Sequence, residues 1–249
     1  MDNIDKFTGR AEQYARFRPG YPEEYFDYLV GASSLSRTSI VADIGAGTGI
    51  FTKHLLNRGV TVYAVEPNAD MRSAAQDYLR DYPGLRILDG CDADTRLAAH
   101  SIDLITVAQA FHWFNTEKFR AECRRILKPA SKVALVWNRQ VLDNALVQEI
   151  ACVCGSLCPS FHGFAGSRTD LSKMDFYKDG VYDYREYSDD LPYSLEQFIG
   201  RSLSSSYAPK NEDKNYAQFV LELEGVFAKY NQQGILYMPN RLCSYLGEV

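Results

Sequence analysis

Three glycines at alternate positions, Gly45, Gly47 and Gly49, follow a short apolar segment at residues 40–44 and precede an amphipathic segment at residues 51–58. The pattern predicts a strand, a tight turn and a helix. Glycine permits a positive φ in such a turn, and its missing Cβ lets a ligand approach the backbone closely. The helix adds unpaired N–H groups and the positive end of its dipole. These residues therefore indicate a binding site for a nucleotide-type ligand.

The spacing of the glycines distinguishes between two kinds of such ligands. The dinucleotide fingerprint G-x-G-x-x-G would place its third glycine at position 50, where this chain has Ile50. Here the third glycine comes one position earlier, and Asp43 lies inside the end of the predicted strand. This spacing disfavours a nucleotide-dependent oxidoreductase. A glycine-rich turn is weak evidence by itself, so a plain loop stays an alternative.

A second predicted strand, residues 61–65, ends at Glu66, about 20 residues after the glycines. A nucleotide-binding βαβ unit has its acceptor for the ribose hydroxyls at this position, and one carboxylate can accept both hydroxyls. The alternative is a solvated glutamate at the end of a strand. The distance to the glycine turn favours the ribose-binding role.

Two residues directly after this strand, Pro67 and Asn68, lead into a predicted helix at residues 71–82. Pro67 ends the strand, and Asn68 or Asp70 can cap the helix. Met71, in the first turn, is placed to contact an adenine face. A methionine at such a position is as often simply part of the core.

A third predicted strand, residues 86–88, is followed by several acids, one of which should lie near an adenine. The exocyclic amino group of adenine needs an acceptor, and a neighbouring backbone N–H can serve a ring nitrogen. By position we choose Asp92 with Ala93. Asp89 and Asp94 are the competing choices, and any of the three acids could be a solvated loop residue.

A fourth predicted strand, residues 101–109, runs into the segment 110–114. Open α/β sheets bind ligands at the carboxyl ends of their strands, between the first and the fourth strand. Gln109, His112 and Trp113 therefore lie at a favoured place, and His112 is the candidate general base there by position. A packed corner between strand and helix is the alternative.

The residues before the first strand contain a proline-rich turn at 18–22 and a predicted helix at 23–30. Tyr14 and Arg18 lie four residues apart and share one side if this part is helical. The alternative for this pair is a surface cation beside an aromatic side chain.

The regular βα alternation stops after a fifth predicted strand, residues 132–138, which is almost wholly apolar, as expected for a strand buried on both faces. We interpret residues 139–182 as a lid-like insertion over the site. Beyond it, Ser194 is placed to cap a helix, and a long helix at 212–232 precedes a last strand at 235–245.

The predicted organisation is a single domain, residues 1–249, made of an N-terminal helical cap (1–38), a ligand-binding core (39–138), the lid-like insertion (139–182) and a C-terminal part of the sheet (183–249). A chain of this length can bury a large core.

Composition excludes several function classes. The net charge of −5 leaves no basic footprint for nucleic acid. No apolar run reaches the roughly 18 residues that span a bilayer. The first residues, Met-Asp-Asn-Ile-Asp-Lys, are too polar for a signal peptide. We therefore expect a cytoplasmic protein.

The six cysteines are expected to be reduced thiols in a cytosolic chain of this size. Cys152, Cys154 and Cys158, with His162 beyond them, raise the question of a metal site. Their spacing matches none of the usual zinc pairings, so we interpret them as small apolar side chains on a helix and predict no metal.

The order of these parts resembles the class I S-adenosylmethionine (SAM)-dependent methyltransferases over nearly the whole chain. The resemblance is carried by segments 43–49, 66–68, 91–93 and 124–129. More narrowly, segments 14–22 and 107–114 resemble the trans-aconitate methyltransferase-like branch of the type 11 methyltransferases. One departure is Ala130-Ser131, where that family usually has two glycines.

The resemblance implies a Rossmann-like seven-stranded sheet in the order 3-2-1-4-5-7-6, with strand seven antiparallel, and SAM as the cofactor. It implies transfer of a methyl group to a small molecule, with a carboxylate among the candidate acceptors, in a monomer or homodimer. A non-catalytic SAM-binding protein is the alternative.

Two sets of site residues follow from the motifs and the resemblance together. The residues assigned to the cofactor are Tyr14, Arg18, Asp43, Gly45, Ala46, Gly47, Thr48, Gly49, Glu66, Pro67, Asn68, Met71, Asp92, Ala93 and Gln109. The residues assigned to the acceptor are Arg18, His112 and Trp113. The planar fork of Arg18 would hold a carboxylate, and the ring of Tyr14 would favour the sulfonium cation.

Overall fold

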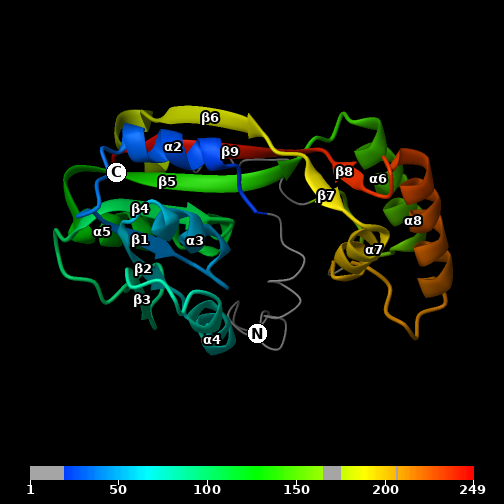
Figure 1. The fold of residues 1–249 in the computed structure, drawn as a ribbon, viewed down its shortest axis with the longest axis horizontal. Coiled ribbons are helices and arrows are strands. Elements are labelled where there is room, and N and C mark those ends of the chain that lie inside the picture. The colour runs from blue at the N-terminus through cyan, green and yellow to red at the C-terminus, as the bar shows by residue number, and fades with distance from the viewer. Residues whose placement is uncertain (1–19, 165–174, 206) are drawn as a thin grey trace.

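The computed structural model describes residues 20–164, 175–205 and 207–249. In this part of the chain, a seven-stranded sheet has the order β3-β2-β1-β4-β5-β9-β6 (Figure 1). The strands are β1 (Ile40–Ile44), β2 (Thr61–Val65), β3 (Leu85–Leu88), β4 (Ile102–Ala108), β5 (Leu127–Gln140), β6 (Asp183–Ser188) and β9 (Asn240–Gly247).

The strand β9 is antiparallel to both of its neighbours, β5 and β6, whereas the pairs among β1 to β5 are parallel. Counted along the chain, β9 is the seventh strand of this sheet, so the order is 3-2-1-4-5-7-6 with strand seven antiparallel. The predicted fold class is therefore confirmed.

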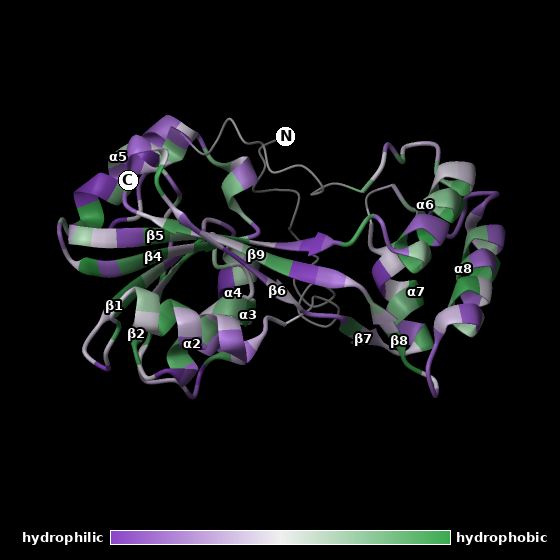
Figure 2. Ribbon diagram, turned by 90° about the horizontal axis from the view of Figure 1, so that it is seen from above, coloured by the Kyte–Doolittle hydropathy of each residue, from purple (hydrophilic) through white to green (hydrophobic). Residues whose placement is uncertain are grey.

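Helices cover both faces of this sheet, as Figures 1 and 2 show. On one face, α5 (Thr116–Ile126) packs against alternate residues of β5, including Val133 and Leu135. On the other face, α2 (Glu23–Ala32) and α3 (Ile50–Asn57) pack against the intervening residues Ala134 and Val136. Burial on both faces explains why the central strands are almost wholly apolar.

A short helix and a 3₁₀ turn complete this part of the fold. The helix α4 (Ala69–Tyr78) begins at Asn68, whose side chain accepts from the N–H of Met71. The 3₁₀ turn η2 (Phe111–Trp113) follows β4 directly. Both elements begin at the carboxyl ends of strands, where the predicted site lies.

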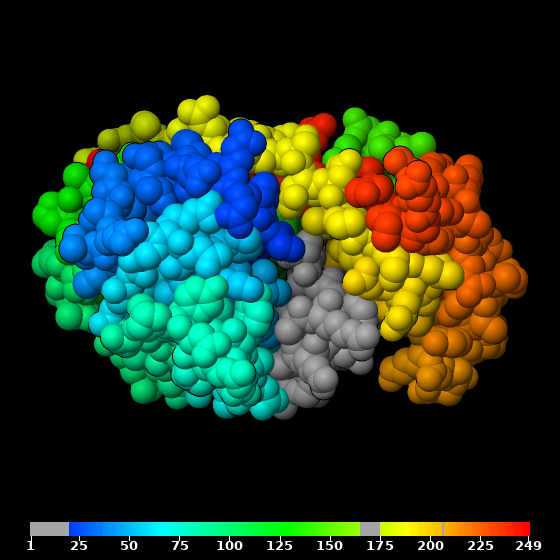
Figure 3. Space-filling model, viewed as in Figure 1, coloured from blue at the N-terminus to red at the C-terminus, as the bar shows by residue number. Residues whose placement is uncertain are grey.

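A second, smaller lobe has its own core. It consists of α6 (Ala145–Leu157), α7 (Leu195–Leu203), α8 (Tyr216–Tyr230) and a two-stranded antiparallel sheet of β7 (Leu191–Tyr193) and β8 (Leu236–Met238). Figures 1 and 3 show this helical lobe at one end of the molecule, and Figure 1 shows α5 near the opposite end. Residues 139–182 contribute α6 to it, and whether they act as a lid stays a prediction.

The predicted last strand, residues 235–245, is two strands in the structure. Pro239 separates them, and because proline has no N–H it cannot donate to a β ladder. The first piece, β8, pairs with β7, and the second, β9, pairs with β5 and β6. The break therefore transfers the chain from the helical lobe back to the main sheet.

Among the described residues, every helix is too short or too polar to span a bilayer.

Candidate functional site

The glycine turn follows β1 and is held against the end of β2. The N–H groups of Gly45 and Ala46 donate to the carbonyl oxygen of Val65 at 2.8 and 3.2 Å. Gly47 has a φ of +57°, and a Cβ built there would meet no described atom within 4 Å. Gly49, with a φ of +83°, begins α3, and a Cβ there would lie only 2.6 Å from Leu79. The turn is therefore closed on its helix side and open at Gly47.

Glu66 faces this opening from the end of β2. Its Oε2 accepts from the N–H of Gly47 at 3.0 Å, and its Oε1 accepts from the N–H of Asn68 at 2.9 Å. Burial raises the pKa of Glu66, while the two backbone N–H groups oppose that rise. Each carboxylate oxygen retains acceptor capacity, so hydroxyl donors can bind beside the turn.

Asp43 lies beneath the turn and is almost fully buried. One of its oxygens accepts from the hydroxyl of Thr52 at 2.6 Å, and the other accepts from the hydroxyl of Thr106 at 2.8 Å. Burial raises the pKa of this carboxyl to about 6. Asp43 therefore links β1 to α3 and β4, and its direct contact with a ligand stays a prediction.

Thr48, in the middle of the turn, carries a polar atom that the described residues do not satisfy. Its side chain is 2% exposed, and its hydroxyl oxygen is buried with no hydrogen-bond partner among them. A buried hydroxyl without a partner is costly and uncommon. The turn thus offers a hydrogen-bonding group to whatever binds there.

The residues after β2 are ordered by one arginine that the sequence reasoning missed. Nη1 of Arg72 donates to the carbonyl oxygens of Glu66 and Pro67 at 2.9 and 2.7 Å, and it also contacts Asp89 at 3.1 Å. Met71 is buried against the core. Arg72 occurs one helical turn after the cap residue Asn68, and only this position in the sequence could have indicated that its side chain reaches back to the loop after β2.

The loop after β3 forms a narrow turn in which Cys91 and Asp94 pair. Asp92 Oδ2 accepts from the N–H of Asn115, the cap residue of α5, at 3.1 Å. Ala93 is exposed at the tip. The structure thus brings the predicted Asp92–Ala93 pair beside the start of α5, and a contact with adenine stays a prediction.

The corner after β4 lies next to the glycine turn. A Cβ on Gly45 would be only 2.6 Å from the Cβ of Ala110. Gln109 has a left-handed backbone, with a φ of +59°, and its Nε2 donates to the carbonyl oxygen of Asn138 at 3.4 Å. A non-glycine residue in this region stores strain, which often occurs at functional sites.

His112 and Trp113 protrude from this corner on the turn η2. Their ring centroids lie 4.7 Å apart, and Trp113 is 42% exposed. Phe111, by contrast, is buried in the core against Trp137 and Phe176. The corner therefore combines a packed residue with two accessible aromatic side chains. Tyr14 and Arg18, the other predicted members of the site, lie outside the described residues.

Sequence reasoning also missed polar side chains where β5 ends and β9 begins. Asn138 Oδ1, Arg139 Nε and Asn240 Nδ2 are buried without partners among the described residues. Asn138 and Arg139 come directly after the apolar run of β5, and that change of polarity was the only signal in the sequence.

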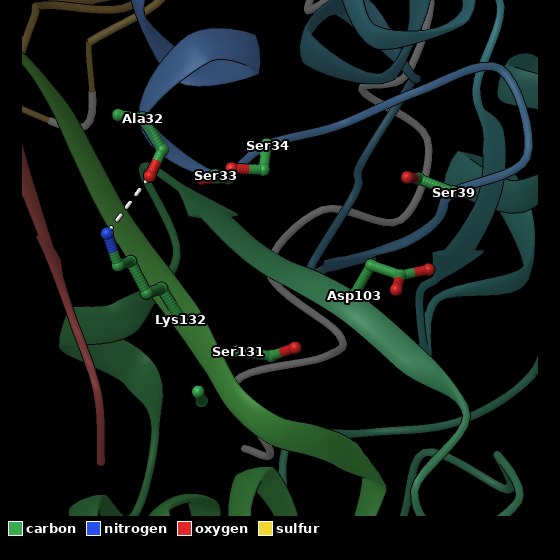
Figure 4. A pocket seen from close by; sticks show the side chains of 8 residues that line it. Ala32, Ser33, Ser34, Ser39, Asp103, Ser131 and Lys132 are labelled. Carbon is green, nitrogen blue, oxygen red and sulfur yellow. Dashed lines mark hydrogen bonds between the residues drawn. The ribbon is translucent and has the colours of Figure 1, made fainter.

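A cavity of about 330 Å³ lies at the amino ends of the strands, opposite the candidate site (Figure 4). Its walls include Ser39 before β1, Asp103 at the start of β4 and Lys132, whose ammonium group donates to the carbonyl oxygen of Ala32 at 3.0 Å. Ligands of open α/β sheets bind at the carboxyl ends of the strands. This cavity is at the amino ends, so it is not part of the candidate site.

The cysteine cluster lies in the helical lobe. Cys154 and Cys158 are 2% exposed within its core, whereas Cys152 is exposed. The interpretation of these thiols as buried apolar side chains is thus confirmed for Cys154 and Cys158 and wrong for Cys152. No group of three or more His, Cys, Asp or Glu side chains in residues 20–164, 175–205 and 207–249 is arranged to hold a metal ion.

The fold defines an open α/β protein, and the glycine turn forms a candidate site for a nucleotide-type ligand at the carboxyl ends of its strands. Residues 42–135 match the methyltransferase domain family. An uncharacterised methyltransferase of Geobacillus sp. (strain WCH70) is 33% identical over 153 residues, which cover 56% of this chain and 71% of that protein. The chain belongs to the methyltransferase domain family.

Other relatives match over a smaller share of their length. An uncharacterised methyltransferase of Mycobacterium tuberculosis (strain ATCC 25618 / H37Rv) is 35% identical over 149 residues, or 60% of this chain. The match spans 58% of that relative's length.

Solved structures share the fold. A candidate type II methyltransferase from Anaeromyxobacter dehalogenans has a TM-score of 0.64 at 22% identity, covering 93% of this chain and 96% of that one. An N-methyltransferase from Haemonchus contortus, solved with phosphomonomethylethanolamine and S-adenosylhomocysteine, has a TM-score of 0.58 at 12% identity. That match covers 100% of this chain and 60% of the nematode chain.

Proposed function

We propose that the chain is a SAM-dependent methyltransferase that transfers a methyl group to a small-molecule acceptor. The observation that carries this proposal is the arrangement of Gly47 and Glu66. A glycine with open space above it lies within hydrogen-bonding distance of a carboxylate at the end of the next strand. This arrangement suits a nucleoside ligand. Part of the ligand can lie directly against the backbone at Gly47, while its ribose hydroxyls donate to the carboxylate of Glu66.

The groups present fit SAM. The ribose hydroxyls would bind Glu66, and the orphaned hydroxyl of Thr48 can serve a polar group of the methionine part. The loop that carries Asp92 and Ala93 would hold the adenine, with Met71 and the segment Pro67–Asn68 beside it. The Haemonchus contortus structure, which shares the fold and was solved with S-adenosylhomocysteine, supports the same cofactor.

Asp43 stabilises the position of the glycine turn in the proposed site. Its two hydroxyl donors come from α3 and β4, so it fixes the turn relative to the corner that carries Gln109. The rigid position of the turn matters because most of the rate gain in methyl transfer can come from proximity and orientation.

Bound SAM would supply an electrophilic methyl group on a sulfonium centre. The chain would then align an acceptor with that methyl group and exclude water. Trp113 and Phe114 would form an apolar wall of the acceptor site, and His112 could take a proton from a hydroxyl or amine acceptor. A carboxylate acceptor would need no base. Arg18 and Tyr14 remain proposed members of this site.

We further propose that residues 139–182 cover the acceptor. The segment leaves the sheet at the carboxyl end of β5, next to the corner after β4. Lids exclude water and often order on binding. Hydrogen exchange of α6 should slow when S-adenosylhomocysteine and an acceptor are both present, and unchanged exchange under proven saturation would contradict the lid.

Two measurements test the proposed function. Calorimetry with SAM, S-adenosylhomocysteine and NAD should show binding of the first two and none of NAD. A screen of small acids, phenols and amines with methyl-labelled SAM should then yield labelled product. Binding of NAD alone would refute the proposal. Binding of SAM without turnover across the screen would favour a non-catalytic SAM-binding protein.

A further inference from the structure

Two arginines face each other where β5 ends and β9 begins. Arg139 is the register partner of Arg241 in this antiparallel pair. Figure 2 shows the hydrophilic ends of these two strands side by side between the two lobes. Directly opposed residues on antiparallel strands share a face and lie close together, and like charges there are destabilising.

Only one of the two guanidinium groups has a carboxylate partner among the described residues. Nη1 of Arg241 donates to Oε1 of Glu186 at 2.8 Å, and the hydroxyl of Tyr184 donates to the other oxygen at 2.7 Å. Arg139 forms no ion pair with any described residue. Its only side-chain hydrogen bond within that part of the chain goes from Nη2 to the hydroxyl of Tyr245 at 3.5 Å, and its Nε is buried without a partner.

The surroundings of Arg139 strengthen the electrostatic interactions of its guanidinium group. Trp137, two residues earlier on the same face, packs edge-on against Phe111 and Tyr245, with ring centroids 6.1 and 5.8 Å away. An apolar wall lowers the local dielectric, so a charge beside it interacts more strongly than in water. The preceding residue, Asn138, accepts from Gln109 at the end of β4. Arg139 therefore lies one strand away from the strain-bearing corner of the candidate site.

We propose that Arg139, with Arg241 opposite it, forms an anion-binding site that holds a single carboxylate of the methyl acceptor. A carboxylate can accept two parallel N–H bonds from a guanidinium group, one of which would satisfy the buried Nε. Because Glu186 already balances Arg241, the pair carries one positive charge that no described residue compensates, which suits a monoanion better than a doubly charged phosphate. Only the identity of the bound molecule as the acceptor rests on the proposed function.

The test uses acetate as the probe and acetamide as its neutral match. Thermal unfolding is followed at constant ionic strength, with chloride as the balancing anion. Acetate, and not acetamide, should raise the unfolding midpoint of the wild type, because a ligand that binds the folded state stabilises it. Arg139→Gln should weaken acetate binding at least tenfold, which is the loss expected for a charge-assisted hydrogen bond.

Arg185→Gln is the matched control, because it removes the same charge from an arginine on β6 that pairs with Asp183. It should keep the acetate effect. Arg139→Glu is a second variant that replaces the like-charge pair by an ion pair with Arg241, so it keeps the test usable if Arg139→Gln does not fold.

Equal stabilisation of wild type and Arg139→Gln by acetate would overturn the site, as would a wild type that responds alike to acetate and acetamide. Calorimetry with S-adenosylhomocysteine separates the two proposals. If the wild type does not bind that molecule, the proposed function fails, whereas the acetate measurement still decides whether Arg139 binds anions. Arg139→Gln should bind S-adenosylhomocysteine as the wild type does.

Discussion

Replacing Asp43 by asparagine should change how the stability of the protein depends on pH. The carboxyl is almost fully buried between Thr52 and Thr106, and burial raises its pKa from 3.8 to about 6. One pKa unit corresponds to about 1.4 kcal/mol, so this rise amounts to about 3 kcal/mol. Because the folded state holds the proton more tightly, this contribution is fully present below pH 3.8. It is lost as the pH rises through about 6.

The asparagine side chain in the Asp43→Asn variant would not titrate, yet it can keep both contacts. One threonine can donate to its oxygen, and the other can accept from its nitrogen. The free energy of unfolding in urea should therefore be compared between Asp43→Asn and wild type at pH 4 and at pH 7.5. The variant should gain about 2.4 kcal/mol relative to wild type on going to the higher pH, slightly less than the full value of about 3 kcal/mol because the unfolded carboxyl is already more than half ionised at pH 4. Taking the difference removes the contribution of other acids, such as Glu66.

Parallel pH profiles of the two proteins would refute this reasoning, because they would show that the carboxyl is ionised at no cost in the folded state. The same variant decides what Asp43 does in the site. If it only links β1 to α3 and β4, affinity for S-adenosylhomocysteine at pH 7.5 should stay near that of wild type. A loss of more than about tenfold, or 1.4 kcal/mol, would indicate a direct contact with the ligand.

Three further predictions concern the turn and its surroundings. Glu66→Ala should weaken S-adenosylhomocysteine binding by about 1.5–3 kcal/mol in calorimetry, the value of a lost charge-assisted hydrogen bond; unchanged affinity would remove Glu66 from the ribose site. Gly47→Ala should fold with about 1 kcal/mol of backbone strain and lose ligand affinity. Gly155→Ala, in the last turn of α6, should instead gain up to roughly 0.5–1 kcal/mol of stability and keep the ligand affinity. A Gly47→Ala variant that binds like wild type would show that no ligand approaches there. Ala130→Gly should raise the free energy of unfolding by up to about 1 kcal/mol, because Ala130 has a φ of +62°. A free energy of unfolding below that of wild type would mean that the left-handed backbone costs alanine nothing here.

Much of the fold was predictable because its signals are local. Alternation of apolar strands with amphipathic helices is set by neighbouring residues, and the helix cap at Ser194 is present as predicted, with Gln197 completing a capping box. The miss at residues 235–245 has a local cause as well. Pro239 was visible in the sequence, but its effect depends on which partner each half of the segment finds, and β7 is only three residues long.

The residues of the candidate site also differ in whether local sequence signals could predict them. Gly47 and Glu66 could be predicted because their separation along the chain follows from the geometry of one βαβ unit, and the hydrogen bond between them joins the turn after β1 to the end of β2. Thr106, by contrast, reaches Asp43 from 63 residues away. Nothing in the local pattern of β4 distinguishes this threonine from an ordinary strand residue, so the support beneath the turn appears only once β1 and β4 are paired.

The opposition of Arg139 and Arg241 depends on strand register in the same way. The two residues are far apart in the sequence, and each alone is an ordinary arginine at the end of a strand. A shift of β9 by one residue would turn Arg241 to the other face of the sheet. Register is fixed by the apolar residues Leu242, Cys243, Tyr245 and Leu246, which pack into the cores on the two faces. Packing of the core therefore holds two like charges together, and an anion at that place would relieve the repulsion that the packing imposes.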